Sequence, residues 1–398
     1  MKNKTDITPD IKADTSARRD RGESTTLMEP LLIGEGSRHR TALTDLALEL
    51  AQRTAGFRRS LPESLLTSLA GLVRAMNCYY SNLIEGHDTH PVDIERALKN
   101  DYSKDARKRD LQLEAKAHIT VQEWIDGGGL KGRALTGDGI REIHRRLCEL
   151  LPEDLRWVED PESKERAKVV PGELRRKGVM VGRHVAVSPG AIPRFLARFE
   201  EVYSHLNRTD AILGAAAAHH RLAWIHPFLD GNGRLGRLLI TLFLVERSIL
   251  PAPLLYLSAF FEATRSDYYD RLIGISERAE WGAWLEYFLT GVARQAEDAL
   301  SRAARINGLL DKWRMAAGSP SKARGLVDLL AENPYWTVKR AAQRLGVAYT
   351  TAERAVERLE SASILARIGD AKRDRIYCAR AILEILEEPA NLKPMENP

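Results

Sequence analysis

The chain has little cysteine and no long apolar run. Its three cysteines, Cys78, Cys148 and Cys378, are scattered and form no CxxC pair, which argues against a disulfide framework and favours a reducing cytoplasm. The best candidate for a membrane span begins at Leu238 but meets Glu246 after eight residues, far short of the roughly 18 that a span needs. The N-terminus has no apolar core and so is not a signal peptide. We therefore expect a cytoplasmic protein.

Helical periodicity dominates the part of the chain that is rich in apolar residues. The exception is the stretch KGVMVGRHVAV, in which valines alternate around Gly182 and Arg183 and predict a β-hairpin. The sequence thus predicts a mainly α fold with one small hairpin. Helices are expected at Thr41–Ala55, Glu63–Glu85, Pro91–Asn100, Ala106–Ile125, Thr136–Leu150, Ile192–Asn207, Ala211–Ile225, Arg234–Arg247, Asp267–Glu277 and Trp281–Met315.

Changes in composition divide the 398 residues into segments. Polar, charged residues at the N-terminus predict a disordered tail, and the sequence GSPSK after the last long helix resembles a linker. We expect a tail over 1–38, an N-terminal helical region over 39–130, a second helical domain over 131–316, a linker over 317–322, a small module over 323–388 and a tail over 389–398.

The stretch HPFLDGNGRLGR, which runs from His226 to Arg237, joins two predicted helices. A helix start offers unpaired backbone N–H groups and the positive end of the helix dipole, and together these form an anion site. Gly231 and Gly233 let the backbone approach a phosphate with no Cβ in the way. Asn232 between them tolerates unusual dihedral angles or donates its amide. This part of the stretch is suited to binding phosphate.

The charged residues of the same stretch add the chemistry of group transfer. Arg234 and Arg237 are three apart, so they share one helix face and can bind further phosphate oxygens. The Asp230 carboxylate can hold Mg²⁺ against those phosphates. His226 lies beside them and is suited to take a proton from an attacking hydroxyl. Each residue alone is more often structural, but their combination in twelve positions favours transfer from a metal-bound nucleotide.

Rival signatures for phosphate and metal sites are missing. There is no GxxxxGK[ST] motif, and no predicted strand precedes the glycines, as a dinucleotide-binding fold requires. His219, His220 and His226 lack the i, i+4 pairing of helical zinc ligands, and there is no HExxH motif. These absences argue against a P-loop, a dinucleotide fold and a zinc site.

The stretch from His226 to Arg237 matches the HxFx[DE]GNGRxxR signature of the Fic family at every defined position, and the resemblance extends over much of residues 40–315. The resemblance implies an all-helical domain with one small hairpin. Most members of the family transfer AMP from ATP to a hydroxyl side chain of a protein. This chain is therefore similar to a Fic protein adenylyltransferase, with residues 131–316 as its catalytic domain.

The resemblance also implies a role for each matching residue. His226 would be the general base towards a Tyr, Thr or Ser hydroxyl, and Asp230 would be the Mg²⁺ ligand. Phe228 would be a buried anchor for the stretch. Nucleotide contacts are implied for the rest of the signature, for the hairpin turn, which resembles the family's target-docking flap, and for a tyrosine pair: Gly231, Asn232, Gly233, Arg234, Leu235, Gly236, Arg237, Val181, Gly182, Arg183, His184, Tyr268 and Tyr269. The two tyrosines are equally consistent with ordinary core aromatics.

A second motif supports the resemblance. Ser81-Asn-Leu-Ile-Glu85-Gly86 matches the [ST]xxxE[GN] inhibitory motif of the family. Ser81 and Glu85 are one helical turn apart and so share a face. The resemblance implies that Glu85 binds Arg237 in the resting state and displaces the γ-phosphate of ATP.

The C-terminal module resembles a winged helix. Three short amphipathic stretches, with Gly346 between the last two, predict a helix-turn-helix, in which Tyr349, Thr350 and Arg354 sit where a recognition helix would contact bases. The stretches Ile364–Arg367 and Arg375–Tyr377 could be the strands of a wing with its tip at Gly369–Asp374, where Lys372, Arg373 and Arg375 could meet phosphate. From Ser321 onward, however, there are 13 Lys and Arg against 11 Asp and Glu, a weak basic footprint for a DNA-binding module. Protein docking or dimerisation is at least as well supported as DNA binding.

Several functions stay open on the sequence alone. The same residues could remove AMP, with Glu85 aligning a water molecule, or could transfer another phosphate-linked group. A different class of protein, a DNA-binding regulator with a Fic core as ligand sensor, is disfavoured because a sensor needs no base at His226. ATP and a target protein docked on the hairpin are the expected partners, and self-modification and a homodimer remain open.

Overall fold

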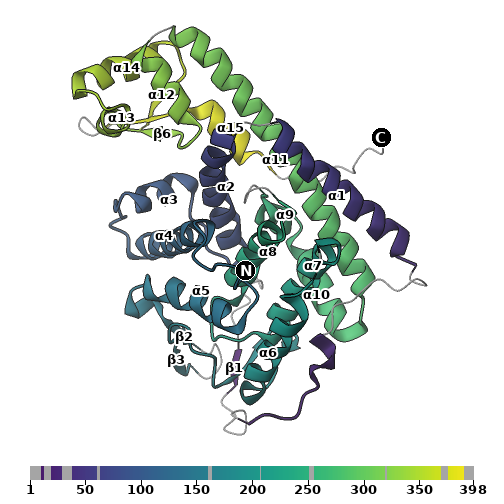
Figure 1. The fold of residues 1–398 in the computed structure, drawn as a ribbon. Coiled ribbons are helices and arrows are strands. Elements are labelled where there is room, and N and C mark those ends of the chain that lie inside the picture. Colours follow the sequence, from purple (N-terminus) through teal and green to yellow (C-terminus); the bar gives the residue numbers. More distant parts are fainter. Residues whose placement is uncertain are drawn as a thin grey trace.

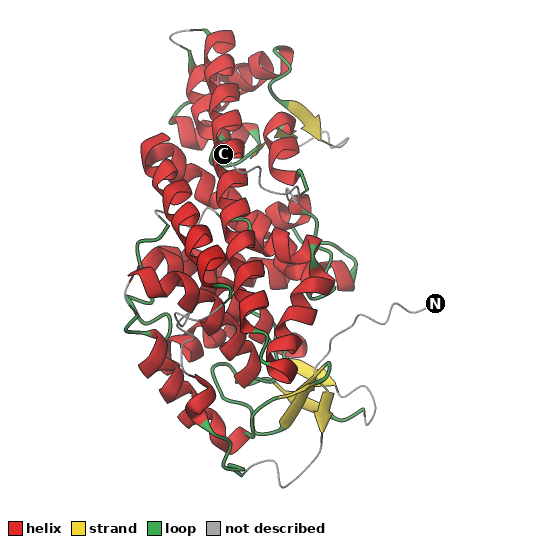
Figure 2. Ribbon diagram, turned by 90° about the vertical axis from the view of Figure 1, so that its right-hand side faces the viewer, coloured by secondary structure: helices red, strands yellow, loops and turns green. Residues whose placement is uncertain are grey.

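The computed structural model is mainly helical, as the sequence predicts (Figure 1). It describes residues 10–12, 19–28, 38–60, 63–159, 164–206, 208–250, 255–318, 321–368 and 375–389. Figure 2 shows helices through the whole length of the molecule, with short strands gathered near its two ends. None of the described helices has the length and apolar character that a bilayer span requires.

The ten predicted helices are all present, with ends that shift by a few residues. Two further α-helices, α9 and α15, lie in the described part of the chain where the sequence predicts none, and α12 begins five residues before the amphipathic stretch at Val327–Leu330. The α-helices of the first 317 residues are α1 (Arg40–Ser60), α2 (Glu63–Ile84), α3 (Pro91–Leu98), α4 (Ala106–Asp126), α5 (Gly137–Glu149), α6 (Ile192–Tyr203), α7 (Arg208–Ile225), α8 (Asn232–Glu246), α9 (Leu257–Ala263), α10 (Arg265–Arg278) and α11 (Trp281–Ala317).

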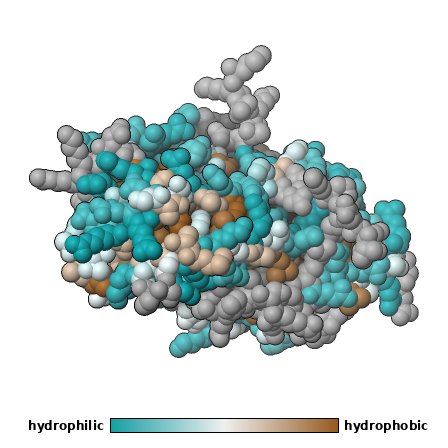
Figure 3. Space-filling model, turned by 90° about the horizontal axis from the view of Figure 1, so that it is seen from above, coloured by the Kyte–Doolittle hydropathy of each residue, from teal (hydrophilic) through white to brown (hydrophobic). Residues whose placement is uncertain are grey.

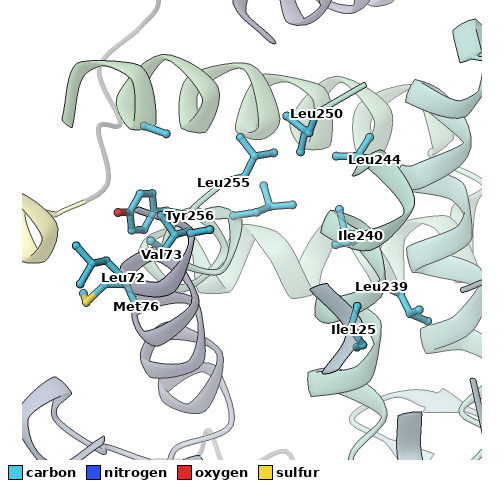
Figure 4. Packing of buried hydrophobic residues seen from close by; sticks show 14 of the residues in the cluster. Leu72, Val73, Met76, Ile125, Leu239, Ile240, Leu244, Leu250, Leu255 and Tyr256 are labelled. Atoms are coloured by element: carbon cyan, nitrogen blue, oxygen red, sulfur yellow. The ribbon is translucent and has the colours of Figure 1, made fainter. Parts of the chain in front are cut away.

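Helix α8 lies at the centre of the core. Most of its side chains are buried, and a helix that is apolar nearly all round belongs in a protein interior. Figure 4 shows side chains of α2, α4 and α8 converging on one another, with Leu255 and Tyr256 between them. The long helix α11 runs beside α1 along one side of the molecule (Figure 1). The first turn of α8, which carries residues of the Fic-like signature, is therefore held on a rigid framework.

The predicted hairpin is present as β4 (Gly178–Val181) and β5 (His184–Val185), joined by a turn at Gly182 and Arg183. We call residues 178–185 the flap. A second hairpin, β2 (Trp157–Glu159) with β3 (Arg166–Lys168), was not predicted, because its strands are short and rich in charge. The flap sheet has a third strand, β1 (Asp10–Lys12), on the free edge of β4.

The N-terminal residues differ from the disordered tail that the sequence predicts over 1–38. Besides β1, the structure describes residues 19–28, which end in the 3₁₀-helix η2 (Thr25–Met28). The Met28 side chain is fully buried in the main core, and η2 packs on α6. The remaining residues of the predicted tail lie outside the described part of the chain. Composition missed these contacts because they are made with residues more than 150 positions away.

The C-terminal module contains seven elements in the order helix, strand, helix, helix, strand, strand, helix. Its sheet has the order β6–β8–β7, and the predicted wing tip Gly369–Asp374 lies outside the described residues. The identification as a winged helix stays a prediction. The elements are α12 (Lys322–Leu330), β6 (Tyr335–Trp336), α13 (Val338–Leu345), α14 (Tyr349–Ser361), β7 (Ala366–Ile368), β8 (Ile376–Cys378) and α15 (Arg380–Glu387).

Buried polar contacts attach this module to the helices before it. Arg302 of α11 donates to the carbonyl oxygens of Ile385 and Leu386 at 2.5 and 3.0 Å and so satisfies the C-terminal end of α15. Arg340 of α13 lies 3.1 Å from Glu95 of α3. The molecule viewed from above, in Figure 3, presents mainly hydrophilic side chains with smaller hydrophobic areas between them.

Candidate functional site

His226 follows directly on the last residue of α7. Its backbone φ is 49°, an unusual left-handed conformation for a residue with a side chain, and its N–H donates to the Leu222 carbonyl at 3.0 Å. Strained backbone of this kind persists only where the surroundings enforce it, and such positions cluster at functional sites. The conformation turns the chain sharply from α7 towards α8 and keeps the imidazole beside the start of α8.

Arg175 enforces this conformation, and sequence reasoning did not single it out. Its Nε donates to the His226 carbonyl at 2.7 Å, and its Nη2 donates to the carbonyls of Val187 and Ile225. Its backbone N–H also donates to the Pro227 carbonyl at 2.9 Å. Arg175 is 2% exposed, and from inside the protein it joins the residues that flank the flap, Lys177 and Val187, to the end of α7. No short motif marks it, because its partners are spread over 50 residues of sequence.

The start of α8 is shaped by residues of the signature. Gly231 is the N-cap residue with φ of 80°, a conformation that a side chain would disfavour. The Asn232 side chain accepts from the Phe228 N–H at 3.0 Å and donates to the Phe228 carbonyl at 2.9 Å, which closes the loop. The fully buried Phe228 ring stacks on His144 with 3.8 Å between the ring centres. Phe228 thus anchors the loop, as the sequence predicts.

A cavity of about 390 Å³, large enough for a nucleotide, lies at the start of α8. It brings together the base candidate, the start of α8, the flap turn and the tyrosine pair. The predicted site residues in its wall are Glu85, Val181, Gly182, Arg183, His184, His226, Asp230, Gly231, Asn232, Gly233, Arg234, Arg237, Tyr268 and Tyr269.

Two of the predicted nucleotide contacts do not reach this cavity. Leu235 is fully buried in the core. Gly236 faces His219 instead, whose Nδ1 lies 3.2 Å from the Gly236 carbonyl. Both lie on the sides of α8 turned away from the cavity, so the structure gives them packing roles.

The tyrosine pair contributes both to the core and to the cavity wall. The Tyr268 hydroxyl lies 2.8 Å from His219 Nε2, and its ring stacks on Phe261 with 4.5 Å between centres. Tyr269 is half-buried beside it. On the opposite wall, His184 of the flap lies 2.8 Å from the Trp224 carbonyl and so ties the flap to α7.

The helix that carries the predicted inhibitory motif reaches Arg237. Arg237 Nη2 lies 2.5 Å from Glu85 Oε1, and Arg237 also donates to the Ser81 hydroxyl and carbonyl at 2.9 and 3.1 Å. Gly233 makes room for this contact, since a Cβ there would lie 2.3 Å from Glu85 Oε1. Ser81, Glu85 and Arg237 therefore meet as the sequence predicts. Gly86 ends the segment with φ of 83° and does not line the cavity.

Arg234 lies between two carboxylates. Its Nη2 donates to Asp230 Oδ2 at 3.1 Å, and its Nη1 lies 3.6 Å from Glu114 Oε2 on α4. The same Glu114 oxygen lies 2.7 Å from His87 Nδ1, and this contact raises the pKa of His87. Glu114 and His87 were not predicted as site residues, because neither belongs to the two motifs. They connect α4 with the segment that follows Glu85.

The electrostatics keep the base neutral and the inhibitory carboxylate charged. Burial, with the nearby charge of Arg175, lowers the pKa of His226 to about 3. Burial alone would raise the pKa of Glu85, but the charge and hydrogen bond of Arg237 outweigh it and lower that pKa. At neutral pH, His226 is therefore free to accept a proton, and Glu85 is an anion on the cationic wall.

Among the carboxylates that line this cavity, Asp230 lies next to the start of α8 and there fits a hard divalent cation. Its side chain is 47% exposed, so one oxygen is open to the cavity while the other contacts Arg234. Within the described residues, no group of three or more His, Cys, Asp or Glu side chains could hold a metal. Mg²⁺ usually binds through one or two carboxylates together with substrate phosphates, so a single open carboxylate beside a phosphate site suits it.

Comparison with known proteins relates the part of the chain around this cavity to one family. Residues 134–244 match the model of the Fic/DOC family. The chain is 30% identical over 227 residues to Protein adenylyltransferase Fic of Drosophila ananassae and likewise of Drosophila melanogaster. Each match covers 52% of this chain and 43% of the relative, so this chain spans less than half the length of the curated relatives it matches.

Solved structures show the same fold. A Fic family protein from Desulfovibrio desulfuricans G20 superposes with a TM-score of 0.54 at 17% identity, over 88% of this chain and 98% of that one. Residues 134–508 of Fic-1 from C. elegans superpose with a TM-score of 0.51 at 20% identity, over 68% and 74%. The family match includes His226 and the whole stretch up to Arg237. Residues 134–244 are therefore similar to the Fic/DOC family. They supply the flap turn and the start of α8 to the cavity, and α10 and the segment at Glu85 add the rest of its wall.

Proposed function

We propose that this protein is a protein adenylyltransferase, which transfers the AMP moiety of ATP to a Tyr, Thr or Ser hydroxyl of a target protein. One observation carries the proposal: a neutral, half-buried imidazole and the cationic start of a helix open into the same cavity. The name Protein adenylyltransferase of the curated relatives supports the same reaction.

The chemistry follows from these positions. His226 accepts the proton of the target hydroxyl as its oxygen attacks the α-phosphorus. The new P–O bond forms while the bond between the α- and β-phosphates breaks, and pyrophosphate leaves. Negative bound phosphates oppose the lowering effect of Arg175, so they raise the proton affinity of His226 when the base is needed. General-base assistance of this kind contributes about 10²–10⁴-fold to the rate.

The start of α8 binds the phosphates. Its unpaired N–H groups and helix dipole attract anions, and Arg234 and Arg237 supply charge-assisted hydrogen bonds for the β- and γ-phosphates. Asp230 would hold Mg²⁺, which supplies charge neutralisation on the phosphate oxygens when bound. The Arg234 contact keeps the Asp230 carboxylate turned towards the cavity.

The flap supplies the docking edge for the acceptor. Its turn lines the cavity next to His226, and an extended target segment on β4 would bring a side-chain hydroxyl to the base. Backbone pairing would do this for many target sequences, because strand addition uses main-chain groups. Pairing of β1 with β4 supports the ability of this edge to accept an extended segment.

We further propose that Glu85 inhibits the resting enzyme. Its carboxylate neutralises Arg237 and occupies space over Gly233, where an outer phosphate would bind. ATP would then bind with displaced phosphates, and misplacement of the reacting atoms by about 1 Å can cost on the order of 10²-fold in rate. Release of Glu85 would restore the reactive arrangement.

The alternatives use the same residues differently. Removal of AMP would require Glu85 to align a water molecule, and transfer of a phosphate would require the nucleotide to bind in reverse. The combination of Asp230 with Gly231 and Gly233 favours the ordinary orientation. A ligand-sensing regulator has no need for a histidine held in a strained conformation in the wall of the cavity.

The test is transfer from labelled ATP. The purified protein and a cell lysate are incubated with ATP labelled at the α- or the γ-phosphate, and protein is separated by electrophoresis. We expect protein-bound label from the α-position and none from the γ-position. Label from the γ-position alone would refute adenylyl transfer, and absence of label with both would favour the sensor.

A further inference from the structure

We propose that the N-terminal segment of this chain is a built-in occupant of the β4 edge of the flap, where it competes with other extended segments. The competing segment is that of a target protein, so this part of the inference rests on the proposed function. Occupation of the edge itself rests only on the contacts of the described residues.

The first observation is backbone pairing on the free edge of β4. One edge of β4 pairs with β5, and the other pairs in antiparallel register with β1: Asp10 with Met180, Ile11 with Val179, and Lys12 with Gly178. The edge of β4 that does not pair with β5 is therefore covered by residues of the same chain. An open edge is a ready template for pairing with another chain, so its covering has a consequence for docking.

The second observation is a polar anchor between the N-terminal segment and the end of the flap. Ser188 is 3% exposed and follows β5 by three residues. Its N–H and its hydroxyl both donate to Glu23, each at 2.7 Å, and its hydroxyl accepts from the Arg21 N–H at 3.1 Å. Three hydrogen bonds on one buried serine fix the segment at the base of the flap.

The anchor continues onto α6. Arg194 donates twice to the Asp20 carboxylate, at 2.5 and 2.8 Å. The pKa of Asp20 is lowered to about 2, chiefly by the hydrogen bond from Arg194, so the carboxylate stays charged at neutral pH. Beyond Glu23, Met28 is fully buried in the core. These contacts hold residues 20–28 independently of β1.

The anchor makes binding of β1 intramolecular. Lys12 precedes Asp20 by eight positions, so β1 is confined near the flap with an effective concentration on the order of 1 mM. If the free segment binds the edge with a dissociation constant on the order of 0.1 mM, the tethered copy weakens binding of any competitor by about ten-fold. Competition of this kind raises the KM for a target and leaves kcat unchanged.

The direction of pairing brings the segment close to the catalytic cavity. In the antiparallel register, the Asp10 end of β1 lies at the end of β4 that leads into the flap turn, and this turn lines the cavity. Thr8 and Thr5 precede Asp10 in the sequence. The segment therefore occupies the edge in the position that a target segment would need.

The test measures whether the edge is free. The probe is a fluorescently labelled peptide with the sequence of residues 6–17, DITPDIKADTSA, titrated with full-length protein and followed by fluorescence anisotropy. The variant is Asp10→Pro with Ile11→Pro, because proline removes the N–H, and two successive residues include the one whose N–H faces β4. We expect about ten-fold tighter binding to the variant than to the wild type.

Two controls accompany the titration. The pair Asn3→Pro with Lys4→Pro carries the same two prolines outside β1 and should bind the peptide like the wild type. Asp20→Asn weakens the anchor while keeping β1 intact and should give an intermediate affinity. Equal binding to the wild type and the Asp10→Pro, Ile11→Pro variant, or no binding to either, would overturn the proposal.

Peptide binding requires no catalysis, so its outcome is separate from that of the proposed function. If the peptide binds the Asp10→Pro, Ile11→Pro variant more tightly than the wild type but no α-label is transferred, the occupied edge stands and the adenylyltransferase assignment fails. If label is transferred but the peptide does not discriminate, the enzyme assignment stands and the built-in occupant is refuted.

Discussion

Replacement of Glu85 by glycine is the perturbation whose effect follows most directly from the contacts. The Arg237 side chain is 4% exposed and that of Glu85 is 29% exposed, so their 2.5 Å contact is a partly buried charged pair. A hydrogen bond to a charged group is worth about 1.5–3 kcal/mol. Each 1.4 kcal/mol corresponds to a factor of ten, so loss of the contact should raise adenylyl transfer by about 10–100-fold.

The substitution should leave the protein folded. Arg237 keeps its hydrogen bonds to the Ser81 hydroxyl and carbonyl, so it is not left without partners. Glu85 follows α2, so the added backbone freedom of glycine costs no more than about 1 kcal/mol. Urea denaturation of both proteins measures this cost.

The assay is initial-rate transfer from α-labelled ATP to the enzyme and to lysate proteins. Glu85→Gln keeps the size of the side chain without its charge and should show a smaller increase. Arg237→Ala should not mimic Glu85→Gly, because it removes the phosphate contact together with the inhibitory one. Unchanged transfer by Glu85→Gly would show that the Ser81–Glu85 pair is only part of a helix surface.

A second assay separates inhibition from a role in AMP removal, since both would make the variant accumulate label. Target protein that already carries labelled AMP is incubated with wild-type enzyme without ATP. Inhibition alone predicts that the label stays on the target. Loss of the label would assign Glu85 to water positioning.

Three further predictions concern other parts of the molecule. Arg175→Lys should lower the free energy of unfolding by about 3 kcal/mol and slow adenylyl transfer, because one ammonium group cannot donate to all the buried carbonyl oxygens that the guanidinium contacts. An unchanged urea midpoint would contradict this. Burial lowers the pKa values of His118, His144, His219 and His226 from the ordinary 6.5 to about 3–4, so the folded state favours their neutral forms. The free energy of unfolding should therefore fall as the pH drops below 6.5, by about 2 kcal/mol for each histidine at pH 5. Equal stability at pH 7 and pH 5 would refute this. Finally, the full-length protein should bind duplex DNA no more tightly than about 10⁻⁶ M at physiological salt, because the C-terminal module is barely basic, and nanomolar, sequence-specific binding in an electrophoretic shift would contradict the preference for protein docking.

Much of the fold was predictable because helical periodicity is a local signal. The helices of the core, the flap hairpin and the residues at the start of α8 all follow from patterns within about 20 residues. The contact of Ser81 and Glu85 with Arg237 was predictable only through the family resemblance, since more than 150 residues separate the partners. The strand at Asp10–Lys12 has no alternating pattern and is defined only by its partner β4.

The residues that position the site were the ones the sequence did not reveal. Arg175 acts on the main-chain carbonyls of Ile225 at the end of α7, of His226 and of Val187 after the flap, and carbonyl groups leave no trace in a sequence. Glu114 meets His87 and Arg234 only through the packing of α4 against the segment after α2 and against α8. Leu235 and Gly236 were overassigned, because a motif does not distinguish the side of a helix that faces the ligand from the side that packs.

The most direct test of the central claim is the intact mass of the purified protein after incubation with ATP and Mg²⁺. Glu85→Gly should gain the mass of one AMP moiety, and Glu85→Gly combined with His226→Ala should gain none while still binding the nucleotide. A gain equal to one phosphate, or a gain of AMP that persists without His226, would contradict adenylyl transfer with His226 as the base.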